Sequence, residues 1–321
     1  MIKFYASKFL QYALLLLLTI TLNFMLPRLM PGDPLKYIVG EDIVLMSAQE
    51  KAEMRALHGL DRPLPKQYLE YWANLFKGNL GYSYSQARSV SELIGDKLPW
   101  TLLLSVSNIL LSTVLGIVFG TIAAWRRGKA LDVASNIFFV FLRSMPSFWL
   151  GMILIAIFGA RLGWLPIFGA ETQWAGYTGI DRALDIARHL TLPLVTSVVL
   201  SVSSVYFTMR YSMIDVLGED YITMAKLKGL PQKNIRYRHA MRNAMIPLST
   251  VVMMNLGYMV GGSTVIETVF SYPGTGRLLY EAVTNRDYPL IQGCFLIITI
   301  CVIAANILSD MLYPLLDPKV K

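Results

Sequence analysis

A short basic segment between two apolar stretches holds the residues of this chain that are best suited to recognition chemistry. Residues 219–247 read EDYITMAKLKGLPQKNIRYRHAMRNAMIP. The segment is soluble in character, whereas most of the remaining chain is apolar. Its charges suit contacts with another molecule. The six basic residues are Lys226, Lys228, Lys233, Arg236, Arg238 and Arg242.

This segment has the pattern of two helices separated by a glycine. Ile222, Ala225 and Leu227 recur at roughly helical spacing, which predicts a helix over residues 220–228. Gly229 follows two lysines and is typical of a helix C-terminus, while Pro231 suits the first turn of a second helix. We therefore predict a compact knob made of two short helices that meet at Gly229.

The other residue types that commonly do chemistry show no catalytic pattern. His58, His189 and His239 are scattered without metal-ligand spacing. Cys294 and Cys301 lie seven residues apart in one apolar segment, too far apart along a helix for a disulfide. The chain has no GxxxxGK[ST] motif, and the apolar segments hold no nucleophile with a base. The sequence thus predicts a non-catalytic protein that binds neither metal nor nucleotide.

The composition indicates an integral membrane protein. Hydrophobic residues make up 55% of the 321 residues, and the mean hydropathy is +0.49. Soluble domains hold about 45–50% apolar residues. The net charge of +8 sits in short loops beside apolar spans rather than in one folded patch, so it favours membrane topology over a nucleic-acid partner.

Six apolar segments are long enough to span a membrane, which takes about 20 residues. No small-x-small cleavage site follows the first segment, so we expect it to be retained rather than removed as a signal peptide. Basic residues concentrate in alternate loops, which places both termini in the cytoplasm. The predicted spans are residues 9–26, 100–125, 136–160, 190–213, 246–270 and 290–312.

A polar segment between the first two spans is predicted to form an extracytoplasmic subdomain. Residues 31–98 hold eight Lys/Arg and nine Asp/Glu, a near-neutral balance that suits the outer side. We expect amphipathic helices over residues 47–57 and 66–76. Ser47, with Glu50 three residues later, predicts a capping box for the first of them.

Several residues within the spans are candidates for a translocation path. Arg143 lies inside the third span, and Pro146 breaks a backbone hydrogen bond just after it. Arg143 either faces a water-filled path or helix partner, or extends to the cytoplasmic headgroups. The fifth span is rich in Met and Gly, which suits either a path that opens and closes or ordinary tight packing. Its candidate residues are Met253, Gly257, Met259 and Gly261.

Gly116 and Gly120 in the second span form a small-xxx-small pair. Such a pair would let a neighbouring helix approach closely.

The basic segment resembles the EAA loop of ATP-binding-cassette importer permeases, in the version of the dipeptide/oligopeptide/nickel permease family. That loop docks on the ATPase subunit. The alternative is that residues 219–247 form a basic cytoplasmic loop with no special function, whose charges only reflect the membrane topology. The family's form has an acidic residue and Tyr, then Ala, Lys-Gly-Leu, His-Ala-x-Arg-Asn-Ala and Pro. The matching residues are Glu219, Asp220, Tyr221, Ala225, Lys228, Gly229, Leu230, His239, Ala240, Arg242, Asn243, Ala244 and Pro247.

Further segments resemble the same family, and specifically its first, or B-type, permease subunit. They are MPGDP (30–34), HGLDRPLPKQY (58–68), GNLGYSYS (78–85), LGWLP (162–166) and residues 261–289. Turn residues in the last segment imply a re-entrant or lip-like outer loop. The outer-loop residues that match are Glu267, Phe270, Pro273, Gly274, Gly276, Arg277, Arg286, Asp287, Tyr288 and Pro289. Met224, Lys226 and Leu227 depart from the family's pattern, which affects only fine contacts with the ATPase.

The resemblance implies an all-α integral membrane protein of the type I importer permease fold, in a bacterial or archaeal cytoplasmic membrane. Residues 1–29 would form the N-terminus and first helix, residues 30–99 the extracytoplasmic subdomain, and residues 100–318 the core permease domain with a coupling loop at 214–247. Ala225 and Gly229 would let this loop sit closely in a cleft of the ATPase, and Glu219 would offer a charged contact.

The resemblance also implies a function and partners. The chain would pair with a second permease, two ATP-binding cassette ATPase subunits or domains that bind ATP and Mg, and an extracytoplasmic solute-binding protein. The cargo would be dipeptides or oligopeptides, with nickel chelates, glutathione or another small solute as alternatives. A secondary transporter is a remote alternative, because Glu267 and Asp310 are the only acids well away from the loops and both lie near span ends.

Overall fold

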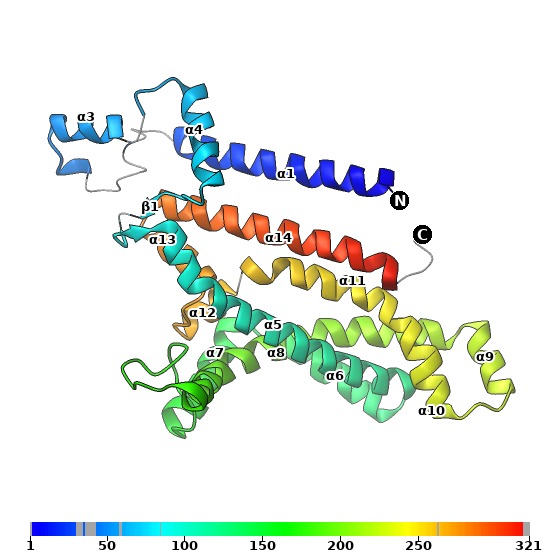
Figure 1. Ribbon diagram of the computed structural model, residues 1–321. Helices are drawn as coiled ribbons and strands as arrows, with labels where there is room; N and C mark the ends of the chain where they lie inside the picture. The colour runs from blue at the N-terminus through cyan, green and yellow to red at the C-terminus, as the bar shows by residue number, and fades with distance from the viewer. Residues whose placement is uncertain are drawn as a thin grey trace. The chain divides into compact units, whose positions relative to one another are not determined.

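The computed structural model describes residues 2–29, 35, 43–57, 60–83, 85–261 and 263–316, and these residues are mainly helical (Figure 1). They form two compact units. The first unit comprises Met1–Thr101 and Pro273–Ile303, and the second comprises Leu102–Tyr272 and Ala304–Lys321. The expected features at residues 30–34, 58–59, 84 and 262 lie outside the described residues.

Among the described residues, four helices are long and apolar enough to cross a membrane, and a bent helix pair makes a fifth if it counts as one span. All five overlap segments for which the sequence predicts spans. The four helices are α1 (Ile2–Leu29), α5 (Val90–Trp125), α8 (Gly179–Leu217) and α14 (Tyr288–Leu316).

The third predicted span is broken, as the position of Pro146 predicts. Helix α6 (Ala130–Arg143) is followed by α7 (Ser147–Leu154), and the direction changes by 96° between them. Pro146 has extended backbone angles and directly precedes α7. A proline has no N–H to donate, and it suits the start of a helix better than its interior. The seven-residue π-helix η2 (Ile155–Arg161) continues α7.

The fifth predicted span, residues 246–270, is not one helix. It begins earlier, because α10 (Gln232–Asn234), the π-helix η3 (Ile235–Met241) and α11 (Arg242–Tyr258) follow one another directly. A 3-10 turn, η4 (Met259–Gly261), ends the run before α12 (Thr264–Val269). Glycine is a poor helix former, so the Gly-rich sequence favours this early end.

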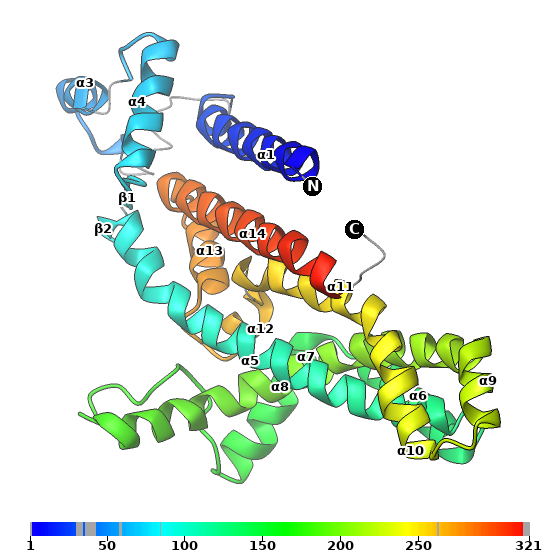
Figure 2. The same ribbon diagram turned by 45° about the vertical axis from the view of Figure 1, so that its right-hand side comes forward.

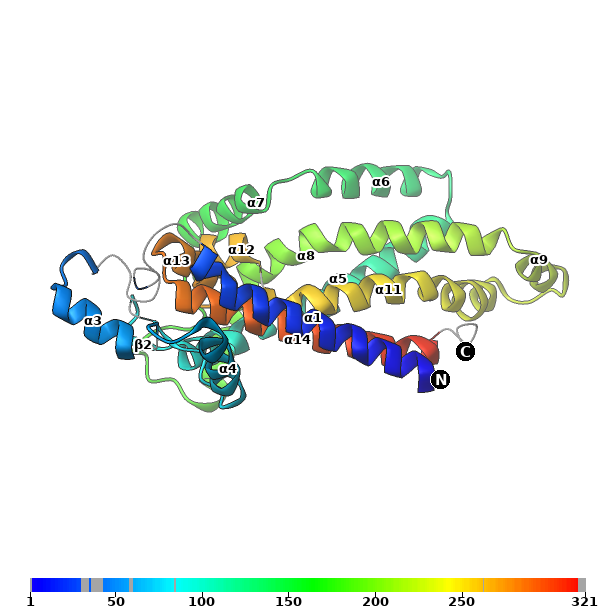
Figure 3. The ribbon, with the colours of Figure 1, turned by 90° about the horizontal axis from the view of Figure 1, so that it is seen from above.

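Helix α8 is the centre of the second unit. It contacts α6, α7 and α11, and Figure 3 shows α8 between α6 and α11. A Cβ atom on Gly116 would lie 2.4 Å from Val205 Cγ1, and one on Gly120 would lie 2.8 Å from the Tyr206 carbonyl oxygen. Only glycine permits this approach of α5 to α8, which confirms the packing predicted from the small-xxx-small pair.

The first unit contains the polar segment and the helices on which it rests. Asn23 of α1 and Gln292 of α14 exchange side-chain-to-backbone hydrogen bonds. The buried core includes Val90, Ile94, Leu278 and Leu290. The remaining elements are α3 (Ala48–Leu57), α4 (Leu64–Phe76), the antiparallel strands β1 (Tyr82–Ser83) and β2 (Arg88–Ser89), and α13 (Thr275–Thr284).

The predicted capping box of α3 is confirmed. The Ser47 N–H donates to Glu50 Oε2 at 2.7 Å, and the Glu50 N–H donates to Ser47 Oγ at 3.3 Å. The two residues therefore satisfy each other's free backbone donors at the helix N-terminus.

Candidate coupling site

The segment singled out in the sequence folds into a helix, a glycine turn and the start of a second helix. Helix α9 (Asp220–Leu227) is followed by Gly229, whose φ of +71° lies in the left-handed region. The Gly229 N–H donates to the Lys226 carbonyl at 3.0 Å, and the Leu230 N–H donates to the Ala225 carbonyl at 3.3 Å. This pair of bonds is a Schellman motif, in which glycine avoids the Cβ clash of the left-handed conformation.

The predicted knob is thus confirmed at α9 and Gly229 and corrected beyond them. Its second helix is not short, because α10 continues through η3 into α11. Figure 2 shows α9 and α10 side by side where the chain turns from α8 into α11. The continuous helix gives the knob a rigid connection to the apolar part of the second unit.

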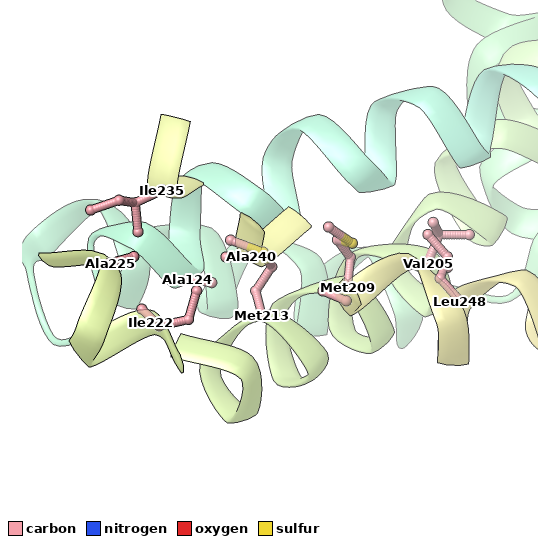
Figure 4. Packing of buried hydrophobic residues seen from close by; sticks show 10 residues of the cluster. Ala124, Val205, Met209, Met213, Ile222, Ala225, Ile235, Ala240 and Leu248 are labelled. Carbon is pink, nitrogen blue, oxygen red and sulfur yellow. The ribbon is translucent and has the colours of Figure 1, made fainter. Parts of the chain in front are cut away.

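One face of α9 packs into the core of the second unit (Figure 4). Ile222 is fully buried and Ala225 is 7% exposed. They belong to one cluster with Ile235, Ala240 and Met213. The small side chain of Ala225 lets α9 lie closely against its own chain. The expectation that this loop sits closely in a cleft of the ATPase stays a prediction.

An exposed apolar ridge lies away from this core and is formed by Tyr221, Met224 and Leu227 of α9 together with Leu230, which follows the glycine turn. Their exposed fractions are 42%, 55%, 77% and 37%. Tyr221, Met224 and Leu227 recur every third residue and so lie near one another on the helix surface. Met224 and Leu227, which depart from the family's pattern in the sequence, are the two most exposed members of the ridge.

Hydrogen bonds and ring contacts fix the ridge to the neighbouring helix. Asn243 Nδ2 donates to Tyr221 Oη at 2.7 Å and to the His239 carbonyl at 3.0 Å. The Arg236 guanidinium lies 4.8 Å from the Tyr237 ring and 5.8 Å from the Trp125 ring at the end of α5. Asn243 thus joins α9 to α11, and Arg236 joins η3 to α5.

Charges surround the ridge on the exposed surface. Glu219 and Asp220 lie at the N-terminus of α9, where acidic side chains are favourable for the helix dipole. The exposed basic residues are Lys226, Lys228, Lys233, Arg238 and Arg242, and Pro247 is exposed within α11. The arrangement offers an apolar centre with a charged rim, as a protein interface does.

A buried ion pair that the sequence analysis missed joins two helices of the second unit. Arg210 of α8 makes two hydrogen bonds to Asp132 of α6, Nε to Oδ1 at 2.7 Å and Nη2 to Oδ2 at 2.9 Å. The Gly128 N–H and Asn136 Nδ2 also donate to Asp132. The two charged residues are 78 positions apart, so spacing along the sequence gives no signal for this pair.

The residues predicted for a translocation path are not gathered in one place. Arg143 is exposed at the C-terminal end of α6. Gly257 is buried, and a Cβ there would lie 3.3 Å from Asn306 Oδ1, so it serves close helix packing. Met259 lines a pocket in the second unit. Met253 and Gly261 are partly buried.

The predicted outer-loop residues are divided between the units. Glu267 of the second unit is fully buried in α12. The first unit holds Pro273, Gly274, Gly276, Arg277 and Asp287, with Gly274 and Gly276 buried at the start of α13. Arg277 Nε bonds Glu281 Oε1 at 2.7 Å. Two short helices, α12 and α13, thus form much of the segment predicted to be a re-entrant or lip-like outer loop, and its place on the outer side stays a prediction.

Asp287 anchors the β-hairpin to α14 within the first unit. Its Oδ2 accepts hydrogen bonds from Ser83 Oγ and Ser85 Oγ, each at 2.6 Å, and its Oδ1 accepts one from the Leu290 N–H at 3.1 Å. In the part of the chain that the structure describes, no group of three or more His, Cys, Asp or Glu side chains could hold a metal ion.

Comparison with known proteins shows the family to which this sequence is similar. Residues 116–321 match the family described as binding-protein-dependent transport system inner membrane component, and residues 1–105 match the N-terminal family of such membrane components. The di/tripeptide transport system permease protein of Pseudomonas aeruginosa is 38% identical over 317 residues, covering 94% of this chain and 93% of that protein.

Two further relatives have similar coverage. The glutathione transport system permease protein of Escherichia coli O6:H1 is 37% identical over 300 residues, covering 94% of this chain and 92% of the relative. The dipeptide transport system permease protein of Escherichia coli K12 is 33% identical over 317 residues, covering 94% of this chain and 93% of the relative.

Proposed function

Because this chain belongs to the family of binding-protein-dependent transport system inner membrane components, we propose that it is the B-type permease subunit of an ATP-driven peptide importer. The exposed ridge of α9 carries the proposal. An apolar ridge on a rigid helical knob suits docking to a protein that moves, since motion is transmitted only through contacts that differ between states.

We assign six spans with both termini in the cytoplasm to the working protein. Five spans are the four long helices and the α6–α7 pair. Helix α11, with 17 residues, would be the sixth, at the lower end of the roughly 17–25 residues that a span requires. The knob then lies on the cytoplasmic side, where its six basic residues obey the positive-inside rule.

The partners proposed are a second permease, two ATPase subunits and an extracytoplasmic solute-binding protein. The ATPases would bind ATP and Mg, so this chain would couple hydrolysis to transport without catalysing it. The relatives named as dipeptide and di/tripeptide permeases support a short peptide as cargo. The relative named as a glutathione permease supports glutathione, itself a small peptide derivative, as the alternative.

The proposal is tested by changing the most exposed residue of the ridge. The complex is purified from its native membrane in mild detergent and then placed in liposomes with the binding protein and a dipeptide. Leu227→Glu should lower recovery of the ATPase and abolish peptide-stimulated ATP hydrolysis, because it puts a charge at the apolar centre of the docking surface. Insertion should be unchanged, since Leu227 is 77% exposed.

Leu57→Glu on α3 is the matched control. Leu57 is 76% exposed on a helix of the extracytoplasmic segment, so the same substitution there should leave ATPase recovery unchanged. Full ATPase binding by Leu227→Glu would contradict the docking surface. Peptide uptake by the purified chain alone, without ATP, would contradict the importer itself.

A further inference from the structure

A polar pocket of about 270 Å³ lies within the second unit, away from the knob. Nine residues of α5, α8, α11 and the segment after α11 line it. Seven of the nine carry a hydroxyl or a carboxamide, and none is charged. The remaining two are Ile109 and Met259. Such a lining is unusual inside helices that are otherwise strongly apolar.

The polar lining arises from helical spacing. Ser105, Asn108 and Ser112 lie three and four residues apart, so they share one face of α5. Ser201 and Ser204 do the same on α8. The pocket is partly enclosed and partly open. Since polar groups facing lipid are costly, its open side must face water or another protein.

Hydrogen bonds hold the pocket wall but leave one acceptor unused. Ser105 Oγ donates to the Met259 carbonyl at 2.9 Å, and Asn108 Nδ2 donates to Ser201 Oγ at 3.1 Å. Asn108 Oδ1 is buried and has no hydrogen-bond partner. A buried acceptor without a partner costs free energy, which a donor brought by a ligand would recover.

We infer that this pocket is a binding site on the translocation path, where hydroxyl and carboxamide groups bind the main-chain amides of a peptide during its transport. The inference rests on the proposed function and specifies its substrate class. Amide N–H and C=O groups match the donors and acceptors of Ser204 and Asn255. Without charges, the pocket holds peptide termini weakly, as a path must if cargo is to leave.

The size and the chemistry of the pocket narrow the cargo further. Its volume is just below the roughly 300–1,000 Å³ of sites for drug-sized ligands, so it holds one or two amino-acid residues at a time. No imidazole, thiolate or carboxylate lines the pocket, so it offers a bare nickel ion none of these ligands. Its hydroxyl and carboxamide groups pair with amides, so the structure assigns amide-containing cargo to this site, and a nickel chelate without amide groups should bind it less well.

Cysteine labelling of the complete importer in liposomes tests this assignment. Ser204 lines the pocket, whereas the adjacent Ser203 is fully buried and does not. In a Cys294→Ser, Cys301→Ser background, Ser204→Cys should react with a small hydrophilic thiol reagent, and Ser203→Cys should not. During ATP turnover with the binding protein, dialanine should slow the labelling of Ser204→Cys about tenfold, and a nickel(II) chelate should not.

Transport by the variant Asn255→Leu provides the second measurement. It removes a hydrogen-bonding group with little change in volume, so dialanine uptake should fall roughly tenfold. Ser203→Ala, the control, should transport normally. Suppose that the wild type takes up dialanine, but that dialanine does not slow the labelling of Ser204→Cys and Asn255→Leu takes it up at the wild-type rate. The assignment of the pocket is then wrong, while the proposed function stands. If the nickel chelate slows the labelling of Ser204→Cys as much as dialanine does, the pocket is not selective for amides. No peptide uptake by the wild type overturns the proposed function as well.

Discussion

Arg210 and Asp132 form a two-bond ion pair that ties α8 to α6 in the second unit, with Nε–Oδ1 and Nη2–Oδ2 distances of 2.7 and 2.9 Å. The side chains of Arg210 and Asp132 are only 12% and 4% exposed. Because the Gly128 N–H and Asn136 supply further hydrogen bonds, the carboxylate is well satisfied in its buried position.

Removing one partner of this pair should destabilise the protein much more than removing both. Asp132→Ala leaves the Arg210 charge buried without a partner, which lowers the free energy of unfolding by about 3–5 kcal/mol in comparable pairs. The double variant Asp132→Ala, Arg210→Ala removes both charges and should recover part of that loss. The measurement is the thermal midpoint of the purified complex in detergent, for both single variants and the double variant. Additive losses would show that the two side chains do not stabilise each other.

Gly229→Asp should weaken docking of the ATPase without unfolding the chain. No atom lies within 4 Å of a Cβ placed on Gly229, so a larger side chain meets only solvent or a partner. The left-handed backbone conformation costs an ordinary residue about 1–2 kcal/mol, and aspartate tolerates it comparatively well. Peptide-stimulated ATP hydrolysis should fall roughly thirtyfold, as at an interface hot spot worth about 2 kcal/mol.

Gly78→Asp provides the control for that experiment. Gly78 has a φ of +73° and open space around it, and it ends α4 with the same two bonds, Gly78 N–H to the Leu75 carbonyl and Asn79 N–H to the Asn74 carbonyl. Backbone strain should therefore be equal in the two variants. If Gly78→Asp loses as much coupling as Gly229→Asp, strain rather than docking is the cause.

Local signals in the sequence predicted the parts of the fold that local chemistry controls. Gly229, the Ser47–Glu50 capping box and the break at Pro146 each depend on a few neighbouring residues, and all three are confirmed. The close approach at Gly116 is confirmed as well, because only small side chains permit it.

Features that depend on tertiary contacts were missed or misplaced. The Arg210–Asp132 pair joins two helices, which periodicity within one segment cannot reveal. The run from α10 through α11 contains Pro247, which reads in sequence as a helix boundary but is accommodated inside α11. The orientation of Ala225 also depended on which face of α9 the core covers.

Asp287→Ala should release the β-hairpin from the start of α14. The carboxylate accepts bonds from two serine hydroxyls and from the Leu290 N–H, and each hydrogen bond to a charged group contributes about 1.5–3 kcal/mol. We expect faster proteolysis within residues 82–89 and faster amide exchange at Leu290. Asp287→Asn, which keeps the shape, should have a smaller effect. Unchanged exchange in the Ala variant would mean that apolar packing alone holds the hairpin.

The capping box of α3 should no longer stabilise the fold in acid. Hydrogen bonds from the Ser47 backbone N–H and hydroxyl favour the charged carboxylate and lower the pKa of Glu50 below its ordinary value. A carboxylate whose folded pKa is lowered stabilises the fold above its unfolded pKa, about 4.3 for glutamate, and the contribution disappears as the pH falls through the lower folded value. Amide exchange at Glu50 and Lys51 should therefore accelerate, after correction for intrinsic rates, as the pH falls from about 5 to about 3. In Glu50→Gln the same amides should show no such dependence on pH. An equal acid response in both proteins would assign the effect to another carboxylate.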